Sequence, residues 1–157
     1  MLDLDKFKSI NNRLGHQVGD EVLQAVARTI EGTCRPYDIP ARYGGEEFVI
    51  LVPGGDLAGG AALAERVRAN LEALQLVTPV TASFGVAGVP ETTGAAAEAL
   101  VLADAALLQA KETGRNRVVR ADELGPGALT VVAAAAGVAP PPTPPPGAPP
   151  PAGPGPL

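Results

Sequence analysis

Two adjacent glutamates, Glu46 and Glu47, follow a pair of glycines in this sequence and are its clearest candidates for metal chemistry. The apolar segments on either side, residues 39–43 and 49–52, have the composition of strands. A glycine pair between strands indicates a hairpin, because both glycines can take positive φ without a Cβ clash. Successive strand residues point to opposite faces, so the two carboxylates should have different tasks. Carboxylates on a rigid turn suit a hard cation that prefers oxygen ligands, whereas a solvated acidic turn is the simpler alternative.

Three other polar stretches accompany this hairpin in the chain. They are Asp3-Leu4-Asp5-Lys6-Phe7-Lys8-Ser9-Ile10-Asn11, Gly15-His16-Gln17-Val18-Gly19-Asp20, and Ala103-Asp104 through Ala110-Lys111 to Gly114-Arg115-Asn116-Arg117. Together with Gly44-Gly45-Glu46-Glu47-Phe48, they closely resemble the motifs of the GGDEF family, the diguanylate cyclases. The resemblance covers roughly residues 1–120, and four ordered motifs make a chance agreement very improbable.

The resemblance implies a divalent metal site for Mg²⁺ or Mn²⁺. In the family, the acid that matches Asp3 binds the metal, and the residue that matches Leu4 contributes its backbone carbonyl. Glu46 would complete the ligands, and Glu47 would add a metal contact or take the proton of the attacking hydroxyl. Lys8 matches a lysine beside the phosphates, with a solvated surface charge as its alternative. The alternative for Asp3 is a helix N-cap.

The resemblance also implies a set of substrate-binding residues. Asn11 and Asp20 match the residues that read guanine, because an amide and a carboxylate both suit the polar edge of that base. Asp20 could instead cap a helix, and His16, which we place in the same set, could instead make a structural hydrogen bond at a helix entry. Lys111 and Arg115 match the cations that grip the triphosphate, and complementing a helix C-terminus is their alternative role.

Arg35 and Asp38 lie just before the hairpin, three residues apart. In the family, an Arg-x-x-Asp at this distance is an inhibitory site for the product, since a guanidinium suits phosphate or guanine and a carboxylate suits guanine N–H groups. A weak surface ion pair is the alternative. In the last motif, Leu108 departs from the family pattern, which usually has tyrosine at this position. Asp104 matches a family acid, and a surface charge is its alternative role.

The elements that must position these residues follow from hydrophobic periodicity. Before the hairpin we expect a strand ending at Asp3, a short helix over residues 6–14 and a longer helix over about 20–32. After the hairpin we expect a helix with its buried stripe at Leu63, Val67 and Leu71, a strand over 80–89, a helix over 95–112 and an edge strand near 118. This order predicts an α+β sandwich with helices packed on a mostly antiparallel sheet. The architecture resembles the nucleotidyl-cyclase and polymerase-palm fold.

Composition limits the function further. The chain has 157 residues, of which we assign 1–124 to one domain and 125–157 to a disordered tail rich in Ala, Pro and Gly. A net charge of −5, no Trp and few other aromatic residues argue against nucleic-acid binding. A single cysteine allows no internal disulfide and fits a reducing, cytoplasmic location, and we predict no membrane segment.

The expected reaction is phosphoryl transfer, in which two GTP form cyclic di-GMP and release pyrophosphate. Because the attacking hydroxyl and the phosphorus belong to two nucleotides, two half-sites must face each other, which predicts a homodimer. The family domain normally begins before Asp3 with a helix and most of the first strand, so we expect a shortened domain without a sensory domain. A catalytically silent receptor for cyclic di-GMP and an inactive fragment are the alternatives.

Overall fold

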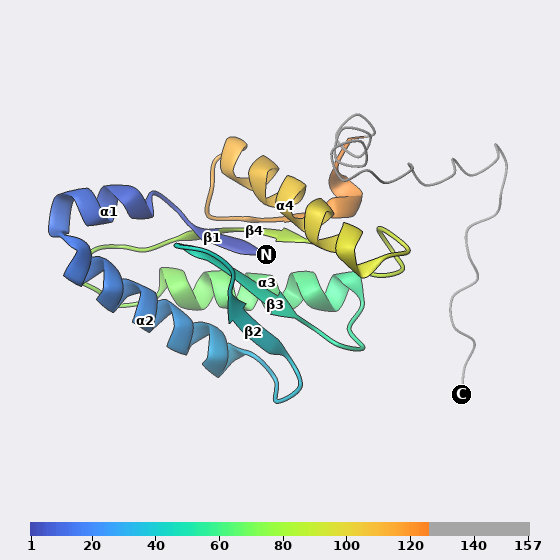
Figure 1. The fold of residues 1–157 in the computed structure, drawn as a ribbon, viewed down its shortest axis with the longest axis horizontal. Coiled ribbons are helices and arrows are strands. Elements are labelled where there is room, and N and C mark those ends of the chain that lie inside the picture. The colour runs from blue at the N-terminus through green and yellow to red at the C-terminus, as the bar shows by residue number, and fades with distance from the viewer. Residues whose placement is uncertain (126–157) are drawn as a thin grey trace, which may run out of the picture.

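The computed structural model describes residues 1–125, which form an α+β sandwich around one five-stranded sheet (Figure 1). Its elements are β1 (Leu2–Leu4), α1 (Phe7–Leu14), α2 (His16–Thr33), β2 (Ile39–Arg42), β3 (Glu47–Leu51), α3 (Leu57–Glu72), β4 (Ala82–Val86), α4 (Ala96–Glu112), β5 (Val118–Arg120) and the 3-10 helix η1 (Ala121–Glu123). This order confirms the predicted one. Apart from Gly125, the predicted tail lies outside the described residues.

The sheet places the short first strand at its centre. The strand order is β2-β3-β1-β4-β5, with antiparallel pairing everywhere except between β4 and β5. Figure 1 shows α4 on one side of the sheet and α2 and α3 on the other. The predicted mostly antiparallel sheet with packed helices is therefore confirmed, and the N-terminal acidic motif lies in the middle strand.

The larger core fills the space between the sheet and helices α1, α2 and α3. Leu2 pairs in register with Phe48 on one side and with Phe84 on the other, so these three buried side chains form one row across the sheet. The expected stripes of α2 and α3 pack against it, with Val26 and Val67 both fully buried. Burial of such apolar surface is the main stabilising term of the fold.

On the opposite face, α4 lies unusually close to the sheet at Gly85. A Cβ on Gly85 would lie 1.9 Å from the carbonyl oxygen of Ala103 and 2.4 Å from the backbone nitrogen of Leu107. Only glycine permits this approach of strand β4 to helix α4. The contact brings the C-terminal half of α4, with its basic motif, over the edge of β1.

Two local possibilities that the sequence left open are not realised. Neither Gly44 nor Gly45 takes positive φ; instead, a Cβ on Gly44 would lie 2.5 Å from Oε2 of Glu47, so glycine is required by the approach of that carboxylate. The helix with the Gly15-to-Asp20 motif begins at His16, with Gly15 as its N-cap, so Asp20 lies beyond the first turn and does not cap it. By contrast, Asp56 caps α3 by accepting a hydrogen bond from the Gly59 amide at 2.7 Å.

Candidate active site

A second row of side chains crosses the sheet on the face covered by α4. Asp3 pairs in register with Glu47 of β3 and with Ser83 of β4, and side chains of directly paired residues point to the same face. Asp3 is only 8% exposed although it carries a carboxylate. The hairpin motif and the N-terminal motif are thus adjacent because β1 and β3 are neighbours in the sheet, which the sequence alone does not specify.

Lys111 and Glu46 complete a charged cluster around Asp3. The Nζ of Lys111 lies 2.9 Å from Oδ2 of Asp3. Burial raises the pKa of Glu46 above its ordinary value, the Asp3 carboxylate raises it further, and Lys111 opposes the shift. Glu47 and Lys8 act on the same pKa in smaller measure, the first raising and the second lowering it. Four predicted site residues therefore act on the ionisation of a fifth, Glu46.

This cluster has the donor chemistry for a divalent cation. The Asp3 carboxylate disfavours ionisation of Glu46, and a cation bound between the two would relieve that conflict. The amide of Leu4 donates a 3.2 Å hydrogen bond to the carbonyl oxygen of Glu46, which ties the hairpin tip to the end of β1. Among residues 1–125, however, no three His, Cys, Asp or Glu side chains are grouped closely enough to hold a metal ion. The predicted ligands include three carboxylates, Asp3, Glu46 and Glu47, besides the Leu4 carbonyl, and these three are not grouped that closely.

The predicted guanine-reading residues lie on helices α1 and α2. Oδ1 of Asn11 is buried and has no hydrogen-bond partner among the described residues, which is uncommon for a buried polar atom. This oxygen would lie 1.9 Å from a Cβ on Gly19, so the glycine makes room for the amide. Asp20 and His16 are exposed on α2, and Asp20 lines a pocket of about 370 Å³ that Asn11 does not reach.

Arg42, which the sequence analysis missed, lines the same pocket and holds the hairpin. Its Nε donates to the carbonyl oxygen of Gly44 at 3.1 Å, and its Nη2 donates to that of Gly45 at 2.6 Å. The guanidinium therefore fixes the backbone just before Glu46. The only signal in the sequence for this role of Arg42 was its position near the glycine pair. An exposed arginine in a strand has no distinctive sequence pattern.

A separate pocket of about 310 Å³ contains the predicted inhibitory residues Arg35 and Asp38. The Arg35 amide donates a 2.7 Å hydrogen bond to Oδ2 of Asp38, so the carboxylate is held by backbone. Within residues 1–125 the two side chains form no ion pair, contrary to the surface-pair alternative. Arg66 of α3 also lines this pocket. The sequence analysis assigned Arg66 no role.

Arg115 lies in the loop after α4 and is exposed. Its side chain has no hydrogen bond or ion pair within the described residues, and it follows Lys111 by four positions. Leu108 and Asp104 are exposed on α4. The structure thus brings Asp3, Glu46, Glu47, Lys8 and Lys111 together, whereas the predicted inhibitory pair lies in its own pocket.

Comparison with known proteins supports a common origin for these motifs. The family model described as "Diguanylate cyclase, GGDEF domain" matches residues 1–117. The chain is 43% identical to the probable diguanylate cyclase DgcT of Escherichia coli, covering 78% of this chain and 28% of that protein. It is 41% identical to the diguanylate cyclase VdcA of Vibrio cholerae, covering 76% of this chain and 37% of that protein. The chain therefore spans well under half the length of these curated relatives.

Solved structures share both fold and sequence with the chain. The GGDEF domain of DgcB from Caulobacter crescentus, solved in complex with c-di-GMP, superposes with a TM-score of 0.72 at 34% identity, covering 78% of this chain and 75% of that one. The active GGEEF domain of a diguanylate cyclase from Vibrio cholerae gives a TM-score of 0.72 at 30% identity, covering 76% of this chain and 78% of that one.

None of the helices in residues 1–125 has the length and apolar character needed to cross a membrane.

Proposed function

This chain belongs to the family of diguanylate cyclase GGDEF domains, and from that premise we propose that it condenses two GTP into cyclic di-GMP with release of pyrophosphate. The observation that carries the proposal is the convergence of Asp3, Glu46 and Lys111, from three distant parts of the chain, on one partly buried point beside β1. Carboxylates and a cation held together at the edge of a sheet suit metal-dependent phosphoryl transfer.

Asp3, the Leu4 carbonyl and Glu46 would hold Mg²⁺ or Mn²⁺, and Glu47 would add a contact from the adjacent register position. The cation would supply charge neutralisation for the phosphate oxygens. Glu47 would also accept the proton of the attacking ribose hydroxyl, and its position on the same face as Asp3 supports that role. Asp3 of β1 would therefore bind the metal ion, while Glu47 of β3 would accept the proton.

The remaining cations would bind phosphate. Lys111 already neutralises Asp3 at 2.9 Å, and Lys8 lowers the pKa of Glu46 from the same region. Arg115, with its exposed guanidinium, would grip the outer phosphates in bidentate fashion. Catalysis in such a site comes from positioning and charge stabilisation, which fits a site built from side chains on rigid elements.

Guanine would be read on the helical side of the site. Oδ1 of Asn11 has no hydrogen-bond partner among the described residues, and Asp20 and His16 present polar groups from the exposed face of α2. An amide and a carboxylate together satisfy both the acceptors and the donors of guanine. Since one site holds one GTP and the product needs two, we propose that two copies of the domain face each other during the reaction.

Product feedback is a further part of the proposal. Arg35, Asp38 and Arg66 line one pocket away from the charged cluster, and two guanidinium groups beside a carboxylate suit a guanine nucleotide with its phosphates. The same pocket favours a second candidate function, a catalytically silent receptor for cyclic di-GMP. Two measurements separate the candidates: calorimetry with cyclic di-GMP on the Glu46→Gln variant, and turnover of GTP by the wild type. A silent receptor would bind the dinucleotide equally well in the variant and in the wild type, and its wild type would show no turnover.

The cyclase proposal is tested with the full chain, GTP and Mg²⁺ by measuring pyrophosphate and cyclic di-GMP. We expect wild-type turnover and a loss of at least about a hundredfold in Glu46→Gln, because a carboxamide cannot neutralise the cation. Glu123→Gln, which changes an exposed residue of η1, is the matched control and should keep full activity. Equal rates in Glu46→Gln and wild type would rule the proposal out.

A further inference from the structure

The loop that carries Arg115 has an unusual backbone. Arg115 and Asn116 both have positive φ, 64° and 45°, and neither is glycine. Consecutive L-residues rarely adopt the left-handed region, and asparagine tolerates it better than arginine. Such a conformation persists only where surrounding contacts determine it, and it is concentrated at functional sites. The contacts that hold this loop therefore bear on what it does.

Asp5 holds the loop from the side of the central strand. Its Oδ2 accepts a 3.0 Å hydrogen bond from the Asn116 amide and a 2.7 Å bond from the Thr81 hydroxyl, and its Oδ1 accepts a 2.7 Å bond from the Ser83 hydroxyl. The Asp5 amide also donates to the Thr81 carbonyl oxygen at 2.9 Å. A carboxylate with three donors has little freedom to move, so Asp5 is a fixed acceptor for the loop.

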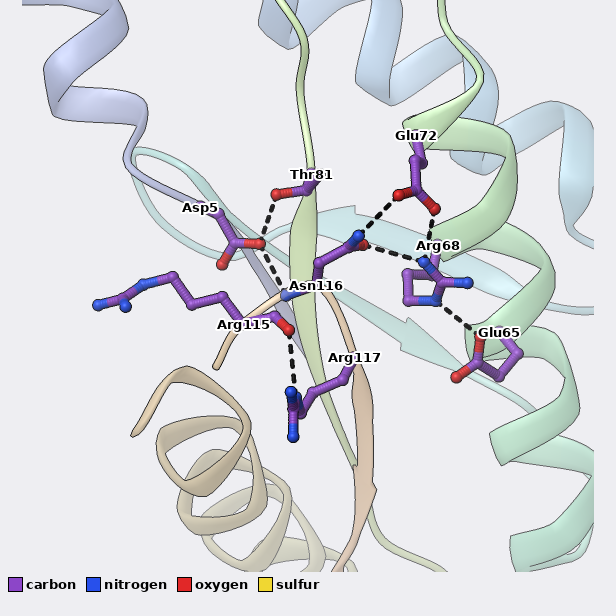
Figure 2. Close-up of polar contacts among 8 residues, drawn as sticks. All are labelled: Asp5, Glu65, Arg68, Glu72, Thr81, Arg115, Asn116 and Arg117. Atoms are coloured by element: carbon purple, nitrogen blue, oxygen red, sulfur yellow. Dashed lines mark hydrogen bonds and ion pairs between the residues drawn. The ribbon is translucent and has the colours of Figure 1, made fainter. Parts of the chain in front are cut away.

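The side chain of Asn116 holds the loop from the side of α3 (Figure 2). Its Nδ2 donates to Oε1 of Glu72 at 2.8 Å, and its Oδ1 accepts from Nη1 of Arg68 at 3.0 Å. Arg68 is itself fixed by ion pairs with Glu65 and Glu72 at 2.7 and 2.8 Å. Asn116 is thus a bridge between the turn after β1 and the last turns of α3.

The backbone of Arg115 is fixed by hydrogen bonds, whereas its side chain is not. Its carbonyl oxygen accepts a 3.1 Å hydrogen bond from Nε of Arg117, and its amide donates to the carbonyl of Ala110 at 2.9 Å. Its guanidinium is left without a partner in the described part of the chain, and Figure 2 shows it extending away from Arg68. The network therefore fixes the backbone of Arg115 and leaves its charged group available.

On the basis of the proposed function, we infer that Asp5 and Asn116 are positioning residues that set the Arg115 guanidinium relative to the Asp3 site. Asp5 follows Asp3 by two residues, so the short segment that leads from β1 into the next turn carries a proposed metal ligand and also anchors the phosphate-binding loop. The hydrogen bond from Asn116 to Asp5 joins segments 111 residues apart. Removing this hydrogen bond should move Arg115 and leave Asp3 and Lys111 in place. The effect of its loss therefore reports a positioning role for Asp5 and Asn116, and not a direct contact of these residues with substrate.

The test is a double-mutant cycle between Asp5→Ala and Arg115→Ala in the full chain, with kcat and KM for GTP measured where circular dichroism shows all variants folded. We expect each single variant to lose about 30- to 100-fold in kcat/KM, because small misplacements of binding groups have effects of that size. If Asp5 acts through Arg115, the double variant should lie within about threefold of Arg115→Ala alone. Asp122→Ala, which removes an exposed aspartate bonded to Arg120, is the matched control and should keep wild-type kinetics.

Two further variants keep the result decisive. Asp5→Asn retains an oxygen for the Asn116 amide, while the Ser83 hydroxyl can turn to accept from the new NH₂ group, so kcat/KM should stay within about threefold of wild type. If Asp5→Ala does not fold, Asn116→Gly replaces it in the cycle, since glycine accepts the positive φ but loses the bonds to Glu72 and Arg68. Additive losses, or a loss no larger than that of Asp122→Ala, would overturn the inference.

Pyrophosphate binding by calorimetry separates this inference from the proposed function. If the wild type shows no GTP turnover but binds pyrophosphate, and the same non-additive cycle is found in the dissociation constants, the cyclase proposal fails and the positioning role stands. If turnover is normal and the cycle is additive, the positioning role fails alone. A wild type that neither turns over GTP nor binds pyrophosphate would overturn both.

Discussion

Nζ of Lys111 lies 2.9 Å from Oδ2 of Asp3, joining the last turn of α4 to the central strand of the sheet. The two side chains are 30% and 11% exposed, so the pair is largely shielded from solvent. Asp3 also raises the pKa of Glu46, and Lys111 opposes that shift. Lys111 therefore balances charge at the point where a divalent cation would compete for the same carboxylate.

Replacing Lys111 with methionine should destabilise the protein most when divalent ions are removed. The variant leaves the Asp3 charge unpaired beside Glu46, which should lower the free energy of unfolding by about 1–3 kcal/mol, between the values for exposed and buried pairs. Thermal unfolding in EDTA and in Mg²⁺ measures this. Mg²⁺ should raise the Tm of Lys111→Met more than that of wild type. Arg28→Met, on the exposed face of α2, should show neither effect.

Gly19→Ala should impair GTP binding without destabilising the fold. The new Cβ would lie 1.9 Å from Oδ1 of Asn11, a side-chain atom that can move away. Alanine in a helix interior gains about 1 kcal/mol over glycine, which offsets the displacement. We expect a near-constant Tm and a KM for GTP raised by about tenfold, the loss of a good hydrogen bond. Gly32→Ala, also in α2 but with no atom within 4 Å of the new Cβ, should leave KM unchanged; an equal KM in both variants would contradict the role of Asn11.

Gly85→Ala should instead damage the fold. Its Cβ would meet backbone atoms of Ala103 and Leu107 at 1.9 and 2.4 Å, which cannot turn aside as a side chain can. Helix α4 must shift from β4, at a cost of about 3 kcal/mol or more, at the upper end for overpacking. Urea unfolding measures the change. Gly94→Ala, whose new Cβ meets nothing within 4 Å, is the control, and similar midpoints for the two variants would argue against the close approach.

Arg66→Met should weaken feedback by cyclic di-GMP. Arg66 lines the pocket with Arg35 and Asp38, and a charge-assisted hydrogen bond to phosphate is worth about 1.5–3 kcal/mol, which corresponds to roughly 10- to 150-fold in the inhibition constant. The measurement is the initial rate against added cyclic di-GMP, expressed relative to each variant's own uninhibited rate. An inhibition constant equal to that of wild type would show that the pocket does not bind product.

Cys34 should react slowly at neutral pH. Partial burial raises the pKa of its thiol above the ordinary value of 9.0, Asp38 raises it further, and Arg66 opposes the shift. Because the thiolate is the nucleophile, the rate of iodoacetamide labelling should reach half its maximum only above pH 9.0. Asp38→Asn should lower this midpoint and Arg66→Met should raise it. Mass spectrometry of the labelled peptide over a pH series checks the direction of both shifts.

The sequence by itself determined the order of the elements and the chemistry of the motifs. Hydrophobic periodicity is local, so the stripe around Val67 predicted its helix without further information, and a strand ending at Asp3 was predicted as well. The motifs named the acids and cations of the site because residue type sets which groups can bind metal or phosphate. The pairing of Asp3 with Lys111 was not predicted, although both residues were.

Only the tertiary structure decided how these groups meet. The register of β1 against β3 places Asp3 opposite Glu47, and pairing partners of a strand depend on the whole sheet. The start of α2 at His16 removed the capping role of Asp20, which short-range propensity had left open. Arg66, Arg42 and Asp5 gained their roles from contacts with distant or backbone atoms, and such contacts leave no periodic trace in the chain. Local energetics therefore specified the elements, while long-range packing specified the site.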